Sequence, residues 1–160
     1  MEETPFLLPF FEAMGQHPVS LYIGSSIWIF PLVQAIHLVF LALLAGAILI
    51  VDLRLLGVGM RDMPLSQVAR DARPWLIAGL IGMVVTGIPQ LMQNSLREYY
   101  SEYFWQKMYL IAFGLLVMVT VRRKVTQRPE TTTFGRVVAV VSILTWGYAV
   151  VSARLIGLFT

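Results

Sequence analysis

The chain has no cysteine and few charged residues, and these absences exclude several classes of protein. Among its 160 residues there is no Cys, and only 13% are Asp, Glu, Lys or Arg. Without Cys there are no disulfides, cysteine-ligated iron–sulfur clusters, thiolate metal sites or cysteine nucleophiles. The sequence also has no phosphate-binding loop, no His-Glu-x-x-His motif and no Gly-x-Ser-x-Gly motif. The chain therefore lacks the motifs of hydrolases and of nucleotide-driven machines. Redox chemistry in this chain would require a bound cofactor.

Hydrophobic residues make up most of the chain. They account for 58% of the sequence, and the mean hydropathy is +0.74. They are gathered into four runs of roughly 17 to 25 residues, the length that a helix needs to cross about 30 Å of hydrocarbon. The loops that remain are too short for a second domain. The sequence therefore predicts an all-α integral membrane four-helix bundle, with residues 1–160 forming a single transmembrane domain.

The apolar runs also predict where the helices begin and end. The transmembrane helices are expected at about 27–51, 74–92, 104–121 and 137–158. The second is expected to open at Pro74, because proline suits the first turn of a helix. A shorter apolar segment, residues 5–14, cannot cross the bilayer and predicts an interfacial helix. The acidic start at Glu2 and Glu3 argues against a cleaved signal peptide.

Basic residues predict the orientation in the membrane. Arg54, Arg61, Arg70 and Arg73 lie between the first two runs, and Arg122, Arg123, Lys124, Arg128 and Arg136 lie between the last two. By the positive-inside rule both loops are cytoplasmic and both termini are outside, in a multi-pass protein of the bacterial inner membrane. This rule also explains the basic pI, so nucleic acid is not an expected partner. Aromatic residues predict a belt at the outer surface: Tyr99, Tyr100, Tyr103 and Trp105.

His37 is the most informative residue, because it lies near the middle of the first run. An ionisable group at that depth usually faces the bundle interior and marks a cofactor, proton or ion path. Helical periodicity places it on one stripe with other residues, which predicts a partly polar inner seam: Gln34, Leu41, Ile48 and Asp52.

Two interpretations of His37 stay open at this point. In the first, the imidazole only forms a hydrogen bond, to Thr86, to a backbone carbonyl or to Gln34. In the second it ligates a metal, with haem iron as the leading candidate, because haem is large, apolar and commonly held by histidine between bundle helices. A proton relay or a copper site are further alternatives.

Other residues are candidates for the same site, each with a plainer interpretation. Lys107 lies one turn inside the third run, where it either snorkels or reaches a haem propionate. Arg154 either pairs with a propionate or an acidic side chain, or snorkels. His17 precedes the first run and is either a second metal ligand or an exposed loop residue. Trp146 packs inward, against the core or a flat cofactor.

Two further patterns concern copper and assembly. Methionines suit Cu(I), although gap filling explains them equally: Met83, Met92, Met108 and Met118. Small residues recur every fourth position along the last run, at Ala149, Ala153 and Gly157. This spacing is typical of close helix contact and indicates an internal seam or a homo-oligomer.

Several segments together resemble a known group of proteins. They are residues 28–37 (WIFPLVQAIH), Gly46, residues 52–57 (DLRLLG), Pro74, Thr86-Gly87, residues 104–107 (FWQK) and Ala153-Arg154. The pattern resembles an uncharacterised bacterial family of small four-helix membrane proteins. More distantly it is similar to the copper-resistance D family and to the membrane protoporphyrinogen oxidase family. The resemblance to the oxidase family implies roles in haem binding or activity for His37 and Lys107. Gln106 stands where that oxidase carries another histidine.

The sequence thus leads to one leading hypothesis and two alternatives. The leading hypothesis is a haem-b-binding inner-membrane protein that passes electrons, with a quinone or a periplasmic protein as partner. The first alternative is a copper transport or delivery protein that uses His37 and the methionines. The second is a structural or assembly subunit of a membrane complex, without a cofactor. Whether the protein is an enzyme is left open by the sequence.

Overall fold

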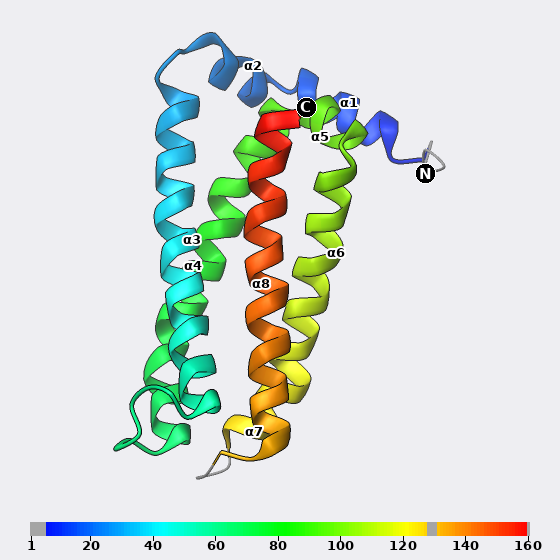
Figure 1. Ribbon diagram of the computed structural model, residues 1–160. Helices are drawn as coiled ribbons and strands as arrows, with labels where there is room; N and C mark the ends of the chain where they lie inside the picture. The colour runs from blue at the N-terminus through cyan, green and yellow to red at the C-terminus, as the bar shows by residue number, and fades with distance from the viewer. Residues whose placement is uncertain (1–5, 128–130, 160) are drawn as a thin grey trace.

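Every element of secondary structure in the described part of the chain is a helix (Figure 1). The computed structural model describes residues 6–127 and 131–159, and the side chains only up to Ser152. The elements are α1 (Leu8–Gln16), α2 (Pro18–Ser25), α3 (Ile29–Leu56), α4 (Leu65–Gln93), α5 (Ser95–Tyr100), α6 (Glu102–Val117), the π-helical turn η1 (Met118–Arg122), α7 (Arg123–Thr126) and α8 (Thr133–Phe159). The all-α prediction is confirmed.

Four helices are long and apolar enough to cross a membrane. They cover Ile29–Leu56, Leu65–Gln93, Glu102–Thr126 and Thr133–Ser152. The protein is therefore a multi-pass membrane protein. The described chain starts and finishes at the same end of the bundle (Figure 1). We call this the outer end, and the opposite end the cytoplasmic end, after the orientation that the basic loops predict.

The second span begins earlier than the sequence predicted. α4 starts at Leu65, nine residues before Pro74, which lies inside the helix together with Pro89. Its first turns are held by the core, where Leu65, Val68 and Ala72 are buried. Hydropathy detects only the lipid-crossing part of a helix, so the amphipathic start of α4 was missed. α3 likewise continues to Leu56, where Gly57 ends it in the left-handed conformation at φ 78°.

The N-terminal segment contains two short helices instead of the single helix expected at residues 5–14. α1 and α2 lie across the outer end of the bundle (Figure 1). They are separated at His17, whose backbone is extended because the residue before Pro18 avoids the helical region. The Ser20 hydroxyl donates to the Met92 carbonyl at 2.9 Å and ties α2 to the end of α4. Their placement at the membrane interface stays a prediction.

The predicted outer aromatic belt is partly an internal cluster. Phe11 of α1 packs with Tyr99 and Phe104, and all three are buried. The indole N–H of Trp105 donates to the Tyr99 carbonyl at 2.9 Å. The sequence could not show this, because it gave no sign that α1 folds over these rings. Tyr100 remains exposed, as a belt residue should be.

Glycines bring the spans together in pairs, α3 with α4 and α6 with α8. A Cβ added at Gly79 would lie 2.9 Å from the Leu44 backbone, and one at Gly82 would collide with the Phe40 ring. Such contacts let helix backbones approach closely in lipid. In the other pair, Gly114 lies under Trp146 and a Cβ there would be 3.1 Å from the indole.

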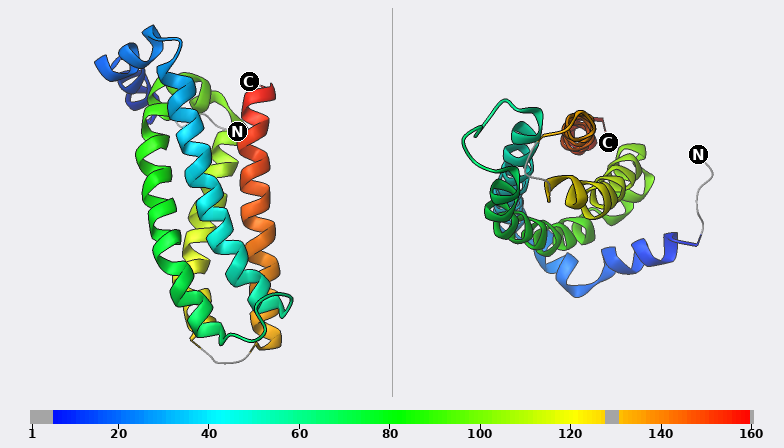
Figure 2. Two further views of the ribbon diagram at one scale, coloured as in Figure 1. Left: turned by 90° about the vertical axis from the view of Figure 1, so that its left-hand side faces the viewer. Right: turned by 90° about the horizontal axis from the view of Figure 1, so that it is seen from below.

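The two helix pairs meet mainly at the cytoplasmic end. All buried residues of α3 lie between Leu44 and Leu55. A core cluster joins α3, α4, α7 and α8 there: Val51, Leu55, Leu65, Val68, Ala72, Val125, Val138 and Ala139. α3 and α8 converge toward this end (Figures 1 and 2). Of the residues predicted to form a polar inner seam on α3, Ile48 and Asp52 are buried and His37 is half-buried. Gln34 is exposed and does not belong to the seam.

The contact between α3 and α4 gives a first prediction. We expect Gly79→Ala to lower the free energy of unfolding by about 1–3 kcal/mol, because its Cβ meets backbone that cannot move aside. The control is Gly46→Ala, where no atom lies within 4 Å of the added Cβ. This control should be neutral or stabilising by up to about 1 kcal/mol, because Ala favours a helix. Thermal unfolding in detergent measures both, and equal melting temperatures would contradict the packing argument.

Candidate functional site

His37 lies in a short hydrogen-bonded chain between α3 and α4. Its Nδ1 is 2.7 Å from the Thr86 hydroxyl oxygen. That hydroxyl donates its proton to the Gly82 carbonyl at 2.6 Å. A hydroxyl has only one proton, so Nδ1 must carry the proton of its own bond and donate it to Thr86. The predicted hydrogen bond to Thr86 is confirmed, and the pattern assigns the tautomer.

This tautomer leaves the other ring nitrogen with its lone pair. In a neutral imidazole with its proton on Nδ1, Nε2 of His37 is an acceptor and has the form in which histidine binds a metal. Metal-ligating histidines usually donate their other N–H to a fixed partner, as His37 does to Thr86. The ring is half-buried, and Gly87 leaves it room, because an added Cβ there would be 3.4 Å from Cε1.

Lys107 already has an anionic partner. Its ammonium lies 3.7 Å from a Glu98 carboxylate oxygen and 5.0 Å from the centre of the Phe104 ring. It is also near enough to interact electrostatically with His37. Of the candidate residues, Lys107 and His37 are thus brought into one region. A propionate at this place would compete with Glu98 for the lysine.

The remaining candidates lie in different settings. His17 is exposed at the outer end, and its Nδ1 accepts the Val19 N–H at 3.3 Å as a cap of α2. Gln34 is exposed one turn from His37. Trp146 packs against Gly114 of α6, which accounts for its inward position. The side chain of Arg154 lies outside the described residues.

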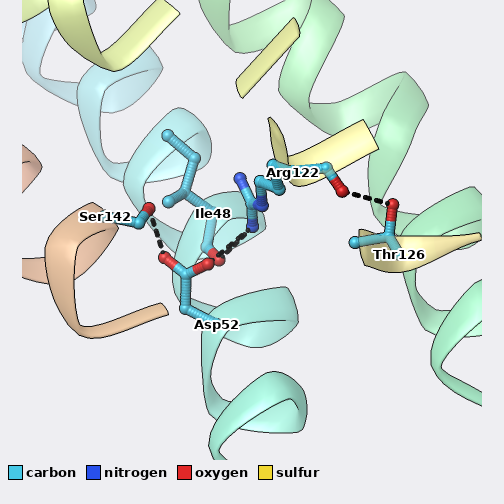
Figure 3. A network of polar contacts seen from close by, with 5 residues as sticks. All are labelled: Ile48, Asp52, Arg122, Thr126 and Ser142. Atoms are coloured by element: carbon cyan, nitrogen blue, oxygen red, sulfur yellow. Dashed lines mark hydrogen bonds and ion pairs between the residues drawn. The ribbon is translucent and has the colours of Figure 1, made fainter. Parts of the chain in front are cut away.

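A second polar centre, which sequence reasoning missed, lies near the cytoplasmic core cluster, and Figure 3 shows its side chains. Arg122 Nη2 is 3.1 Å from Asp52 Oδ1 and donates to the Ile48 carbonyl at 2.7 Å. The Ser142 hydroxyl donates to Asp52 Oδ2 at 2.6 Å. Asp52 is 0% exposed and Arg122 is 5% exposed. These three side chains join α3, η1 and α8 through a buried ion pair, which we call the Asp52–Arg122 centre.

The sequence did not reveal this centre, because Arg122 begins the run Arg122-Arg123-Lys124. Such a run looks like the basic residues that commonly follow a transmembrane helix. In the structure, the π-helical turn η1 ends at Arg122. A wider turn changes the phase of the helix and so the direction of the side chain, and such turns are frequent at functional sites. One signal was available: four small or hydroxyl residues share one face of α8 and are all buried, at Ser142, Thr145, Ala149 and Ser152.

A small cavity adjoins the Asp52–Arg122 centre. Its volume is about 10 Å³, close to the space that one water needs. It is lined by Gly114, Val117, Met118, Arg122, Val141, Ser142, Thr145 and Trp146. Arg122 Nη1 is buried without a hydrogen-bond partner among the described residues. A water in this cavity would give the guanidinium the acceptor that it lacks.

The described His, Asp and Glu side chains do not form a metal site among themselves. Nowhere in 6–127 and 131–152 do three or more His, Asp or Glu side chains gather as a group that could hold a metal ion. Of the two histidines in the chain, only His37 lies inside a membrane span, and its Nδ1 bond leaves the Nε2 lone pair for a metal. A cofactor that brings its own equatorial nitrogens, as haem does, needs only an axial ligand from the protein.

The fold and these two centres define a four-span helical membrane protein with buried polar groups in both halves of the bundle. Within that class the chain belongs to DUF6644, a family of unknown function, whose family model matches residues 14–159. No curated protein and no solved structure matches it. These comparisons do not support the more distant resemblance to the copper-resistance D and protoporphyrinogen oxidase families.

The Asp52–Arg122 centre gives a second prediction. Asp52→Leu or Arg122→Met alone leaves one buried charge uncompensated, and each should lower stability by about 3–5 kcal/mol. The double variant removes both charges and should recover most of this loss. Arg123→Met, at an exposed neighbour, is the control and should leave stability unchanged.

Unfolding in a denaturing detergent titration measures the four variants. Additive losses in the double variant would show that the two side chains do not act as a pair.

Proposed function

We propose that the protein binds a b-type haem through His37 and transfers electrons at the outer half of the bundle. The observation that carries this proposal is the tautomer of His37, which presents an unprotonated Nε2 within the first span. A half-buried imidazole that served only to join two helices would need its Nδ1 bond alone, and the lone pair on Nε2 would have no role. The free lone pair is the feature that a metal ligand requires.

The residues present fit a haem held from one side. His37 would hold the haem iron, and Thr86 would fix the orientation of the His37 ring through the Nδ1–H bond. Lys107 would pair with a haem propionate and would give up its ion pair with Glu98 to do so. The bound iron would supply a one-electron redox change. On the outer side of Leu44 no side chain of α3 is buried, so α3 keeps accessible surface beside His37 where a cofactor could pack.

The orientation favours an electron partner on the outer side. The basic loops predict that His37 lies in the half of the bilayer that faces away from the cytoplasm. A quinone in the membrane or a periplasmic redox protein therefore meets the site first. The chemistry also requires such a partner, since a single haem stores one electron and must pass it on.

Copper transport is the less supported alternative. Copper would need several protein donors in one place, and the described residues form no such group of His, Asp or Glu. The methionines are also spread out: Met118 lines the cavity beside Arg122, while Met92 is at the outer end of α4. The structural alternative, without a cofactor, is the other outcome that the following experiments distinguish.

The proposal predicts a haem spectrum that depends on one histidine. Purified protein, expressed with sufficient haem supply, should show a Soret band that is lost in His37→Ala. His17→Ala should keep the band, because that residue caps α2 at an exposed position. A colourless wild-type protein would exclude haem, and stoichiometric copper in it would support the copper alternative.

The orienting hydrogen bond gives a separate prediction. Thr86→Val removes the acceptor of the Nδ1 proton and should weaken haem affinity about 10- to 100-fold. Thr120→Val is a matched control, because its hydroxyl makes the same type of bond, to the Leu116 carbonyl at 2.6 Å, without a histidine partner. Haem titration of the apoprotein, followed by absorbance, measures both. Equal affinities in the two variants would remove Thr86 from the site.

A further inference from the structure

A second hollow, independent of the proposed haem site, lies at the cytoplasmic end of the bundle. It has a volume of about 300 Å³ and is lined by Thr120, Val121, Lys124, Val125, Thr132 and Phe134. These residues come from the end of the third span and the start of the fourth. The two segments lie beside each other at the lower end of the bundle in Figure 1. The volume is at the lower limit of small-molecule pockets.

One wall of the hollow is apolar. Val125 is buried and belongs to the cytoplasmic core, while Val121 packs against that core. Phe134, in contrast, is 62% exposed and extends the apolar surface outward. Gly135 allows the start of α8 to lie close to α7, since a Cβ there would be 3.0 Å from the Val125 side chain. The hollow therefore has a hydrophobic floor that opens toward the surroundings of the bundle.

Two of the three polar side chains that line the hollow are available as hydrogen-bond donors. The Thr132 hydroxyl oxygen accepts the Gly135 N–H at 3.1 Å, so its own proton remains available. Lys124 is exposed and contributes an ammonium group. Thr120 has already donated its proton to the Leu116 carbonyl. No acidic residue is among those that line the hollow. Lys124 and Thr132 together are suited to an anionic oxygen.

The position of the hollow favours a lipid as its ligand. The third span ends at Thr126, so the hollow lies where the helix leaves the hydrocarbon on the side of the basic loops. An anionic lipid has its phosphate at this level and its acyl chains on the hydrocarbon side. Basic pockets between spans on the cytoplasmic side are typical sites for anionic headgroups.

We propose that this hollow binds an anionic phospholipid of the cytoplasmic leaflet. The phosphate contacts Lys124 and Thr132, and the upper part of an acyl chain covers Phe134 and Val121. A free phosphate ion would use only the donors and would gain nothing from the apolar floor, whereas a lipid buries both. The ligand class is therefore the lipid.

Native mass spectrometry of the purified protein in detergent tests this proposal. Phosphatidylglycerol or phosphatidylcholine is added at equal concentration, and the retained lipid per chain is counted. The wild type should retain phosphatidylglycerol in preference to phosphatidylcholine. Lys124→Gln should weaken retention of phosphatidylglycerol about fivefold. Arg123→Gln makes the same change in charge at an exposed neighbour that does not line the hollow, and it should keep the wild-type preference.

A second variant tests the apolar part of the site. Phe134→Ser leaves every donor in place and should also reduce retention of phosphatidylglycerol. Both Lys124 and Phe134 are exposed, so their replacement should leave the core intact, and the melting temperature without added lipid checks this.

Three results would overturn the proposal. Equal losses in Lys124→Gln and Arg123→Gln would indicate diffuse attraction to the basic end. Equal retention of the two lipids would remove the anionic headgroup from the site. Competition by inorganic phosphate, with Phe134→Ser behaving as the wild type, would assign the hollow to a free anion. None of these outcomes depends on whether haem binds at His37.

Discussion

The buried ion pair between Asp52 and Arg122 is the constraint on which the arrangement of the bundle depends. Either charge alone in the hydrocarbon would be costly, so the two side chains must stay together. Ser142 binds the same carboxylate from α8. Together with the cytoplasmic core cluster, the ion pair therefore holds the two helix pairs against each other at a fixed register. Displacing either pair along the membrane normal would separate the charges.

This fixed end explains why the outer part of α3, before Leu44, can remain without buried side chains. The cytoplasmic core and the Asp52–Arg122 centre lie at one end, and all buried residues of α3 are there. His37 lies on the same helix, about 22 Å away at 1.5 Å per residue. A tight core around His37 is therefore not needed to hold the spans together. Stability at the cytoplasmic end permits a half-buried imidazole ring in the outer part of α3.

Much of the fold could be predicted from the sequence, but only where lipid exposure controls the pattern. The four spans follow from hydropathy. The cost of an imidazole in hydrocarbon predicted a hydrogen bond for His37 and left Thr86 as one of three possible partners, and the structure shows the bond to Thr86. The start of α4 was missed because its first turns are amphipathic and bury Leu65. Arg122 was missed because its inward direction depends on the π-helical turn that precedes it. Such changes of helical phase leave no signal in composition or in the count of charges.

The geometry around His37 indicates that the protein fixes the tautomer before any ligand arrives. A threonine in a helix satisfies its hydroxyl by donating to the carbonyl one turn back, as Thr86 does to Gly82. That local bond leaves the hydroxyl oxygen as an acceptor only. Any histidine that packs against it is then forced to place its proton on the facing nitrogen. The free Nε2 of His37 therefore follows from the ordinary way in which a membrane helix accommodates threonine, and a ligand meets a preformed donor.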